Sequence, residues 1–449
     1  MEIEKETILE LLNESPIRVA ELHGIFAGMN VVNIADFFKD ESKETMLRIF
    51  RLLPKSIASA VFSYMEGDEQ QMLILALSDT EVRDIMDRLF VDDAVDLIEE
   101  MPADVVTRVL QNTPAEKRAV INQMLKYPED SAGSIMTTEY VWLTEDSTVR
   151  TAFDKIRKNG VNKETIYTCY VIDQDRTLLG VVSAKALMLS VEDTLIDDIM
   201  DIDFVSARTT DDQELVARSF KKYGLLAMPV VDADDRLVGI ITVDDVVQII
   251  EEENTEDFEI MSALKPSEEP YLKTGVLQQV RNRIVWLLFL MLSATITGAV
   301  ISGFENALAA LPLLIAFIPM LMDTGGNAGS QSSTLIIRGM ALGEVNFKDI
   351  AVVLWREIRI GFLCGLILGI INFVRIYLTN GQNSLLALTV TASVLLTLIM
   401  AKTIGCLLPM AAKKLRVDPA IMAAPLITTI VDAASLVVYF SIAKVVFKL

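Results

Sequence analysis

The chain has 449 residues, of which 52% are hydrophobic, and its formal net charge is −22 at neutral pH. So acidic a protein would repel phosphates, which excludes nucleic acid as a partner and favours the binding of cations. Three dispersed cysteines form no CxxC pair and no disulfide framework, and a single histidine, His23, excludes a histidine-rich metal site. The first residues lack the basic and apolar regions of a signal peptide, so none is expected.

The charge is unevenly distributed along the chain. Residues 1–270 contain 55 acidic and 26 basic side chains, whereas residues 271–449 contain 7 acidic and 14 basic ones. An acidic hydrophilic part joined to an apolar, mildly basic part is typical of a membrane protein with a cytoplasmic domain. The sequence contains no phosphate-binding loop, catalytic triad or phosphorylatable Asp motif, which argues against an enzyme and against an ATP-driven pump.

Residues 1–130 are predicted to form short amphipathic helices that stack into an acidic superhelix. In one of these helices the apolar residues recur at helical spacing, and Ser78 with Asp79 provides its N-cap. Asp92 and Asp96 lie one turn apart on one face of the next helix. Periodicity alone favours a structural role for these two carboxylates, as a cap and as part of a solvated face.

An internal repeat predicts two similar domains, residues 131–197 and 198–253. The segment Val-Ile-Asp at 171–173 and the segment Leu-Gly-Val-Val-Ser at 179–183 both recur in similar form at an offset of 59 residues. Each copy is predicted as β-α-β-β-α with short apolar strands. This order resembles a tandem pair of CBS domains, which are regulatory α/β modules.

The second copy ends on a candidate nucleotide site. Thr242 and Asp245 match the Thr-x-x-Asp signature of CBS domains, in which the hydroxyl meets a phosphate and the carboxylate meets a ribose. The resemblance implies that an adenine nucleotide such as ATP binds these two residues. The first copy has Ser183 but no Asp three residues later, so at most one nucleotide site is expected.

Five carboxylates occur among the seven residues 251–257, at the end of the repeat. A solvated linker is the usual explanation of such a charge run. Its position between the repeat and the apolar part instead favours a connecting helix, assigned to residues 254–281, that transmits a charge-dependent movement to the membrane.

The remaining residues, 282–449, are predicted to cross the membrane five times. The five apolar segments are 282–303, 310–337, 350–378, 384–410 and 419–446. Lys and Arg precede the first segment and lie between the second and third and between the fourth and fifth, whereas the loops 304–309 and 379–383 contain none. The positive-inside rule therefore predicts cytoplasmic N-terminal domains and a C-terminus outside the cell.

The second apolar segment contains polar residues and glycines that hydrocarbon would not tolerate on a lipid-facing surface. We interpret it as the lining of an ion path, and the candidate residues are Gly325, Gly326, Asn327, Gly329 and Gln331. The glycines would let a hydrated ion or another backbone come close. The alternative is a helix-packing face made of small residues.

Asp432 in the fifth apolar segment is the key candidate, because a carboxylate near the middle of the bilayer is costly unless it is compensated. Lys402 in the fourth segment is the one deep basic residue that could pair with it, which would give a purely structural explanation. A cation site is the other explanation. Carboxylate, amide and hydroxyl oxygens suit a hard ion, and Mg²⁺ keeps its hydration shell, so a single carboxylate can hold it through water.

These features closely resemble the MgtE family of bacterial magnesium channels over essentially the whole chain. The most specific matches are Thr-Gly-Gly-Asn-x-Gly-x-Gln-Ser at 324–332, Asp-Pro-Ala at 418–420, and Asp432. The resemblance implies a homodimer with the pore on its two-fold axis, in which Asp432 of both chains holds the selected ion. It also implies that cytosolic Mg²⁺, bound between the acidic domains, closes the pore through the connecting helix.

The family pattern implies a set of regulatory Mg²⁺ ligands. By position these would be Asp92, Asp96, Asp212, Glu214, Asp245, Glu253, Glu256 and Asp257. Asp245 has two candidate partners, the ribose of a nucleotide and Mg²⁺. The sequence departs from the polar or acidic residues expected of the family at Gly224, Gln248 and Ala424.

The predicted fold is therefore an α-helical membrane protein with five transmembrane helices, a cytosolic all-α superhelical domain and tandem α/β CBS domains. The predicted function is a passive magnesium channel of the cytoplasmic membrane, in contact with lipids and closed by cytosolic Mg²⁺. Two alternatives remain open, namely a secondary divalent-cation transporter coupled to another ion and a membrane-anchored adenylate sensor that transports nothing.

Overall fold

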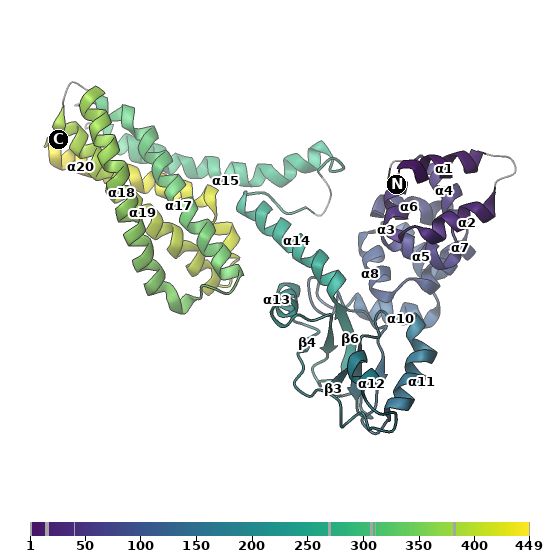
Figure 1. Ribbon diagram of the computed structural model, residues 1–449. Helices are drawn as coiled ribbons and strands as arrows, with labels where there is room; N and C mark the ends of the chain where they lie inside the picture. Colours follow the sequence, from purple (N-terminus) through teal and green to yellow (C-terminus); the bar gives the residue numbers. More distant parts are fainter. Residues whose placement is uncertain are drawn as a thin grey trace. The chain divides into compact units, whose positions relative to one another are not determined.

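The structure is a computed structural model that describes residues 2–13, 18–39, 41–267, 271–305, 309, 311–379 and 383–448. The chain divides into two compact units, Met1–Ile250 and Glu251–Leu449 (Figure 1). The first unit contains the helical superhelix and both α/β repeats, and the second contains the apolar helices. The composition of the chain changes near the same boundary.

The superhelix is built of short helices that pack side by side around one apolar core. They are α1 (Glu2–Asn13), α2 (Val19–Gly28), α3 (Val31–Phe38), α4 (Lys43–Leu52), α5 (Lys55–Ser63), α6 (Gly67–Ala76), α7 (Asp79–Arg88), α8 (Val91–Glu100), α9 (Ala103–Asn112) and α10 (Ala115–Met124). Local signals explain the helix starts. Ser78 forms a capping box with Glu81 at the start of α7, as the sequence predicts for this cap, and prolines directly precede α5, α9 and α10.

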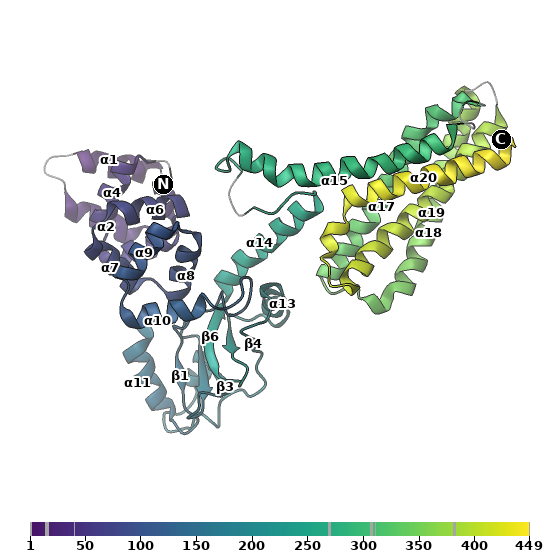
Figure 2. The ribbon, with the colours of Figure 1, turned by 180° about the vertical axis from the view of Figure 1, so that it is seen from behind.

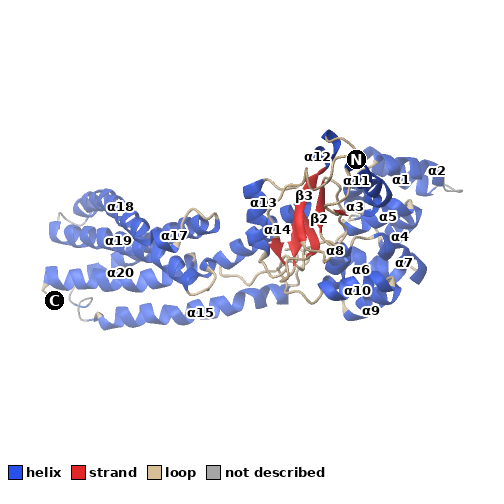
Figure 3. Ribbon diagram, turned by 90° about the horizontal axis from the view of Figure 1, so that it is seen from below, coloured by secondary structure: helices blue, strands red, loops and turns tan. Residues whose placement is uncertain are grey.

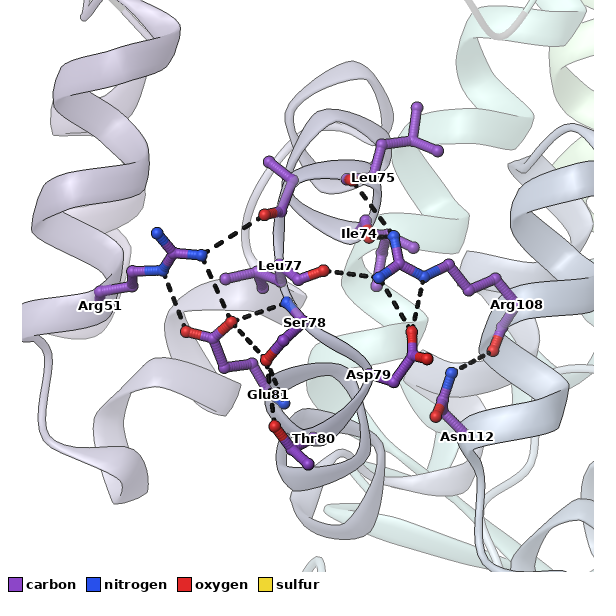
Figure 4. Close-up of polar contacts among 11 residues, drawn as sticks. Arg51, Ile74, Leu75, Leu77, Ser78, Asp79, Thr80, Glu81, Arg108 and Asn112 are labelled. Atoms are coloured by element: carbon purple, nitrogen blue, oxygen red, sulfur yellow. Dashed lines mark hydrogen bonds and ion pairs between the residues drawn. The ribbon is translucent and has the colours of Figure 1, made fainter.

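Two arginines tie neighbouring helices of the superhelix together (Figure 4). Arg108 on α9 donates hydrogen bonds to the carbonyl oxygens of Ile74 and Leu77 at 2.6 Å each, and it pairs with Asp79 at 3.0 Å. These carbonyls belong to the C-terminal end of α6, where the helix dipole favours a cation. Arg51 on α4 pairs with the carboxylate of Glu81 at 3.0 Å. The stack is therefore held by polar contacts at its surface as well as by its core.

The two α/β repeats have the same topology, which confirms the two similar β-α-β-β-α domains predicted from the internal repeat. Their elements are β1 (Trp142–Leu143), α11 (Val149–Asn159), η1 (Gly160–Asn162), β2 (Thr168–Ile172), β3 (Leu178–Ser183), α12 (Ala184–Leu189), β4 (Ala207–Arg208), α13 (Gln213–Tyr223), β5 (Ala227–Val231) and β6 (Leu237–Thr242). In each copy the first strand pairs parallel to the second, and the second pairs antiparallel to the third. The strands are drawn in red in Figure 3. Val171 is paired with Gly180, and Val230 is paired with Gly239, so the register repeats with the sequence.

The helix that follows the second repeat differs from the prediction in its bounds. α14 runs without interruption over Val243–Met261, and turns follow it before α15 begins at Val276. The proposed connecting helix of residues 254–281 therefore begins earlier and ends earlier. The reason is local: residues 243–261 contain no Gly or Pro, whereas Pro266 and Pro270 disfavour helix beyond them.

The second unit is a bundle of long helices. They are α15 (Val276–Gly303), η2 (Pro312–Phe317), α17 (Ile318–Ala341), η3 (Phe347–Asp349), α18 (Ile350–Thr379), α19 (Ser384–Lys414), η4 (Pro419–Met422) and α20 (Ala424–Phe447). Among the described residues, four helical segments are long and apolar enough to cross a membrane, namely α15, the segment η3–α18, α19 and α20. α17 (Ile318–Ala341) corresponds to the second predicted segment, 310–337, and is not one of these four. It is long enough, but its glycines and polar residues lower its hydropathy.

Close helix packing shapes this bundle. α18 presents Gly361, Gly365 and Gly369 at four-residue spacing to α19, where an added Cβ at Gly361 would lie 2.9 Å from the Cα of Ile399. Small residues at this spacing let two helices approach closely in a membrane. α15 runs along α20 (Figure 2), and most of its side chains are exposed in the single chain.

Candidate functional site

α17 carries an exposed polar stripe along one side. Its members are Asp323, Asn327, Gln331, Thr334 and Arg338, spaced by three or four residues, and each is exposed in the single chain. The amide of Asn327 donates a hydrogen bond of 3.1 Å to the carboxylate of Asp323. Such a row is too polar to face lipid, so it must face water or another protein surface. Two of the predicted lining residues, Asn327 and Gln331, lie on this stripe.

The three glycines of the same prediction lie on the opposite side of α17 and are buried. An added Cβ at Gly325 would lie 2.8 Å from Ser435 Oγ, and one at Gly329 would lie 2.8 Å from Ile427 Cγ2. A Cβ at Gly326 would lie 3.0 Å from the Thr428 side chain. In the single chain these glycines therefore let α17 pack against α20 and α19. Their packing within one chain is that of the helix-packing alternative, and the assignment of the three glycines to the lining of the path stays a prediction.

Asp432 lies on α20 next to this contact and is partly buried. Its Oδ1 would be 3.6 Å from a Cβ added at Gly326, and its carboxylate interacts electrostatically with that of Asp323. No Lys or Arg among the described residues forms an ion pair with Asp432. Two carboxylates thus lie near each other in the apolar unit. Asp323 was not among the candidate residues identified from the sequence.

Lys402 has a different partner from the one considered in the sequence. Its ammonium lies 3.3 Å from the hydroxyl of Ser332, and that hydroxyl lies 2.5 Å from the carboxylate of Glu357. All three side chains are buried. The structural explanation of Asp432 through a pair with Lys402 is therefore wrong, because Lys402 contacts Ser332 of α17 instead.

In the first unit, carboxylates from both of its parts come together. Asp92 and Asp93, at the start of α8, interact electrostatically with Asp245 at the start of α14 and with Glu164 in the loop before β2. The Oδ1 atom of Asp92 is buried and has no hydrogen-bond partner among the described residues. A buried, unpartnered carboxylate oxygen beside other carboxylates favours a bound cation.

Asp92, Asp93, Glu164 and Asp245 are called the acidic cluster below, and the pKa of each carboxyl is raised. Burial, followed by repulsion from Asp93, raises the pKa of Asp92 well above its usual range. Burial and Asp245 raise the pKa of Asp93 to about 6, and burial with the same neighbour raises the pKa of Glu164 to about 8. Each shift means that the ionised form is disfavoured without a compensating cation. Sequence reasoning did not identify Glu164, because nothing in its own loop indicates its neighbours.

The other predicted regulatory residues are placed as follows. Asp96 is on α8 with an exposed side chain. Asp212 caps α13 by accepting a hydrogen bond from the backbone of Glu214 at 2.9 Å, and the carboxylate of Glu214 pairs with Arg218. These contacts give Asp212 and Glu214 ordinary structural roles in the single chain.

The remaining predicted ligands lie on α14 and at its start. Glu253, Glu256 and Asp257 are on the part of α14 that belongs to the second unit. Thr242 donates a hydrogen bond of 2.7 Å to Asp245, so the two residues of the nucleotide signature contact each other. Among the described residues, no three Asp, Glu, Cys or His side chains form a group that could hold a metal within one chain.

Comparison with known proteins gives consistent matches over the whole chain. The family model of the MgtE divalent cation transporter matches residues 318–442, that of the MgtE intracellular N domain matches 29–130, and that of the CBS domain matches 132–193 and 196–252. The magnesium transporter MgtE of Thermus thermophilus is 35% identical over 404 residues, with 89% of each chain covered. That of Bacillus subtilis is 33% identical over 440 residues, with 97% of this chain and 96% of the relative covered. The crystal structure of the soluble part of a magnesium transporter matches with a TM-score of 0.53 at 30% identity, covering 56% of this chain and 98% of that chain.

Proposed function

The chain belongs to the MgtE family of divalent-cation transporters, and we propose that it is a Mg²⁺ channel of the cytoplasmic membrane formed by two identical chains. Mg²⁺ is the transported substrate. Five helices, α15 and α17–α20, cross the membrane, with the first unit in the cytoplasm and the C-terminus outside.

The observation that carries this proposal is the polar stripe of α17 beside Asp432. One chain leaves the stripe uncovered, although a hydrocarbon environment would make its exposure costly. A second copy related by a two-fold axis would cover it and enclose a hydrated path between two α17 and two α20 helices. α17 then crosses the membrane despite its low hydropathy, because its polar side faces water rather than lipid.

The chemistry of the path suits a hydrated Mg²⁺ ion. Asp432 and Asp323 supply negative charge, and Asn327 and Gln331 supply amide oxygens, with no thiolate or imidazole to select a softer metal. Mg²⁺ loses its water reluctantly, so carboxylates bind it through its hydration shell. Two copies of Asp432 facing each other would form the selective site.

Cytosolic Mg²⁺ regulates this path through the acidic residues of the first unit and of α14. Asp92, Asp93, Asp245 and Glu164 repel one another when ionised, and a divalent cation removes that repulsion. Asp96, together with Glu253, Glu256 and Asp257 on α14, extends the acidic surface. Loss of the cation at low cytosolic Mg²⁺ loosens the acidic domains and lets α14 release the pore.

Thr242 and Asp245 are also the proposed ligands of an adenine nucleotide. Asp245 belongs to the acidic cluster as well, so a nucleotide there would change the binding of Mg²⁺ by its neighbours. Bound ATP and Mg²⁺ are therefore expected to influence each other's affinity.

The test is Mg²⁺ uptake into liposomes that contain the purified protein. Asp432→Asn keeps the shape of the side chain and removes its charge, so uptake should fall to the level of empty liposomes. Glu344→Gln removes an exposed carboxylate from the turn after α17 and serves as the matched control, with uptake like that of the wild type. Wild-type uptake by Asp432→Asn, at equal protein content, would contradict the proposal.

A further inference from the structure

Three buried polar side chains connect three helices of the second unit. Ser332 on α17 is 1% exposed, Glu357 on α18 is 7% exposed, and Lys402 on α19 is 6% exposed. The serine hydroxyl lies between the other two, 2.5 Å from a carboxylate oxygen of Glu357 and 3.3 Å from the ammonium of Lys402. Neither charged residue is on the polar stripe or beside Asp432, so the proposed ion path leaves both unexplained.

When both ends of this trio are charged, its hydrogen bonds can run in only one direction. An ammonium donates and cannot accept, and a carboxylate accepts and cannot donate. Ser332 therefore accepts from Lys402 and donates its single hydrogen to Glu357. The trio is a neutral unit with its charges compensated through a hydroxyl, and it fixes the side chain of Ser332 relative to both α18 and α19.

The next residue of α17 fixes a second side of the helix. Ser333 donates a hydrogen bond of 2.6 Å to the backbone carbonyl of Met422, which lies in η4 just before α20. Two adjacent serines thus bind α17 to its neighbours: Ser332 contacts α18 and α19, and Ser333 contacts η4. Because successive residues of a helix differ by about 100° around its axis, the two contacts together define the rotation of α17.

The glycine part of the contact between α17 and its neighbours defines that rotation less well than the serines do, although apolar side chains such as Leu321 and Ile336 are buried elsewhere along the helix. Around Gly325, Gly326 and Gly329, α17 has no side chain to lock into its neighbours, and a Cβ at Gly405 of α19 would overlap the carbonyl of Gly329. Glycine faces allow close approach, but they provide no directional bond. Beside these glycines the directional contacts are those of the two serines, and Ser332 immediately follows Gln331 of the polar stripe. Two other hydrogen bonds, from Arg375 to Met320 and from Lys413 to the carbonyl of Met340, lie toward the two ends of α17.

We propose that Glu357 and Lys402 are positioning residues that act through Ser332 to hold α17 in the rotation at which Asp323, Asn327 and Gln331 face the ion path. The inference rests on the proposed function, because it assumes that the stripe lines this path. Neither residue touches the ion. Their effect on transport is exerted through the orientation of α17.

The experiment separates positioning from simple stability. Glu357→Gln and Lys402→Met each leave one buried charge unpaired, and such variants can fail to fold. The double variant Glu357→Gln/Lys402→Met is neutral, and replacing a buried ion pair in this way is often neutral or stabilising. Glu357→Lys/Lys402→Glu exchanges the charges and keeps one donor and one acceptor on either side of Ser332. All four are compared with wild type in liposome Mg²⁺ uptake and in melting temperature.

Helix rotation is measured separately by thiol labelling. Gln331→Cys tests the exposed stripe and Ala328→Cys tests the buried side, in a background where Cys364 is replaced by Ser because Cys169 and Cys406 are fully buried. Labelling with a membrane-impermeant maleimide should be fast at position 331 and slow at position 328 in the wild-type background. The ratio of the two rates reports the orientation of α17.

We expect the neutral double variant to melt at or above the wild-type temperature and to transport Mg²⁺ at least about tenfold more slowly, the scale of a modest population shift. Its labelling ratio should move toward equal rates at the two positions. The charge-exchanged variant should regain part of both the uptake and the ratio. Wild-type uptake and labelling in the neutral double variant, or no recovery on charge exchange in a folded protein, would overturn the inference.

The same experiment distinguishes this inference from the proposed function. The first comparison uses Gln331→Cys in the Cys364→Ser background, with Glu357 and Lys402 unchanged. If a maleimide attached at position 331 leaves uptake unchanged there, the stripe does not line the path and the proposed function fails. If that label blocks uptake and the neutral double variant still behaves as wild type, the path is as proposed and Glu357 and Lys402 do not position it.

Discussion

The packing role of Gly329 can be tested by adding a single methyl group. In Gly329→Ala the new Cβ would lie 2.8 Å from Ile427 Cγ2 and 3.2 Å from the backbone carbonyl of Ala401. Ile427 is fully buried and the carbonyl belongs to a helix, so neither can move freely. Overpacking of this kind costs about 1–3 kcal/mol. An alanine also gains about 1 kcal/mol of helix propensity over glycine, which offsets part of that cost.

A matched control removes the propensity contribution. Gly298 lies inside α15, before its last turn, where an added Cβ would have no heavy atom within 4 Å, so Gly298→Ala has the same propensity gain without the clash. The difference between the two variants is then the overpacking cost. For a unit of the size of Glu251–Leu449, 1–3 kcal/mol corresponds to about 2–12 °C in melting temperature.

The assay is thermal unfolding of the full-length protein in detergent, followed by the loss of the monodisperse peak in size-exclusion chromatography. Gly329→Ala should melt about 2–12 °C below Gly298→Ala. Mg²⁺ uptake by Gly329→Ala should fall in proportion to the folded protein that remains. If the two variants melt together and uptake by Gly329→Ala is blocked at full expression, the glycine lines the ion path and the packing assignment is incorrect.

Three further predictions concern the first unit. The raised pKa values of Asp93 (about 6) and Glu164 (about 8) mean that protonation stabilises the fold at low pH and that this contribution is lost as the pH rises through 6 to 8. The increase in melting temperature caused by Mg²⁺ should therefore grow between pH 5.5 and pH 8. An increase that does not depend on pH would contradict the binding of Mg²⁺ by these carboxylates. Asp92→Asn combined with Asp245→Asn should shift closure to higher cytosolic Mg²⁺ and leave ion selectivity unchanged, as measured by currents at stepped Mg²⁺ concentrations. Arg108→Met should lower the unfolding free energy by about 1–3 kcal/mol, because three carbonyl oxygens at the end of α6 lose their donor, and a denaturant titration that shows no change would refute this.

The sequence was sufficient wherever the information is local. The 59-residue repeat predicted two sheets with one topology, because each copy contains its own strands and its own turn. The start of α7 was predictable from Ser78, whose hydroxyl accepts a hydrogen bond from the backbone of Glu81 in the first turn. Asp432 stood out because a carboxylate in an apolar helix requires an explanation in any fold.

Tertiary neighbours were harder to predict. The small residues of α17 indicated a close contact, but only the packing against α19 and α20 separates Gly325, which is buried, from Asn327, which is exposed. A pair between Lys402 and Asp432 was one of two explanations that the sequence left open, because both are charged and lie in apolar segments. The neighbour of Lys402 in space, Ser332, comes from a third helix. Glu164 joined the acidic cluster through a loop position that periodicity cannot identify.

The most direct test of the central claim is the Mg²⁺ current through membrane patches that contain the protein. For a passive channel closed by cytosolic Mg²⁺, the reversal potential should follow the Mg²⁺ gradient alone, and the current should fall steeply as Mg²⁺ on the cytosolic side is raised. A current or flux that requires a proton or sodium gradient would instead indicate a coupled secondary transporter. A current that is insensitive to cytosolic Mg²⁺ would contradict the regulatory role proposed for the acidic cluster.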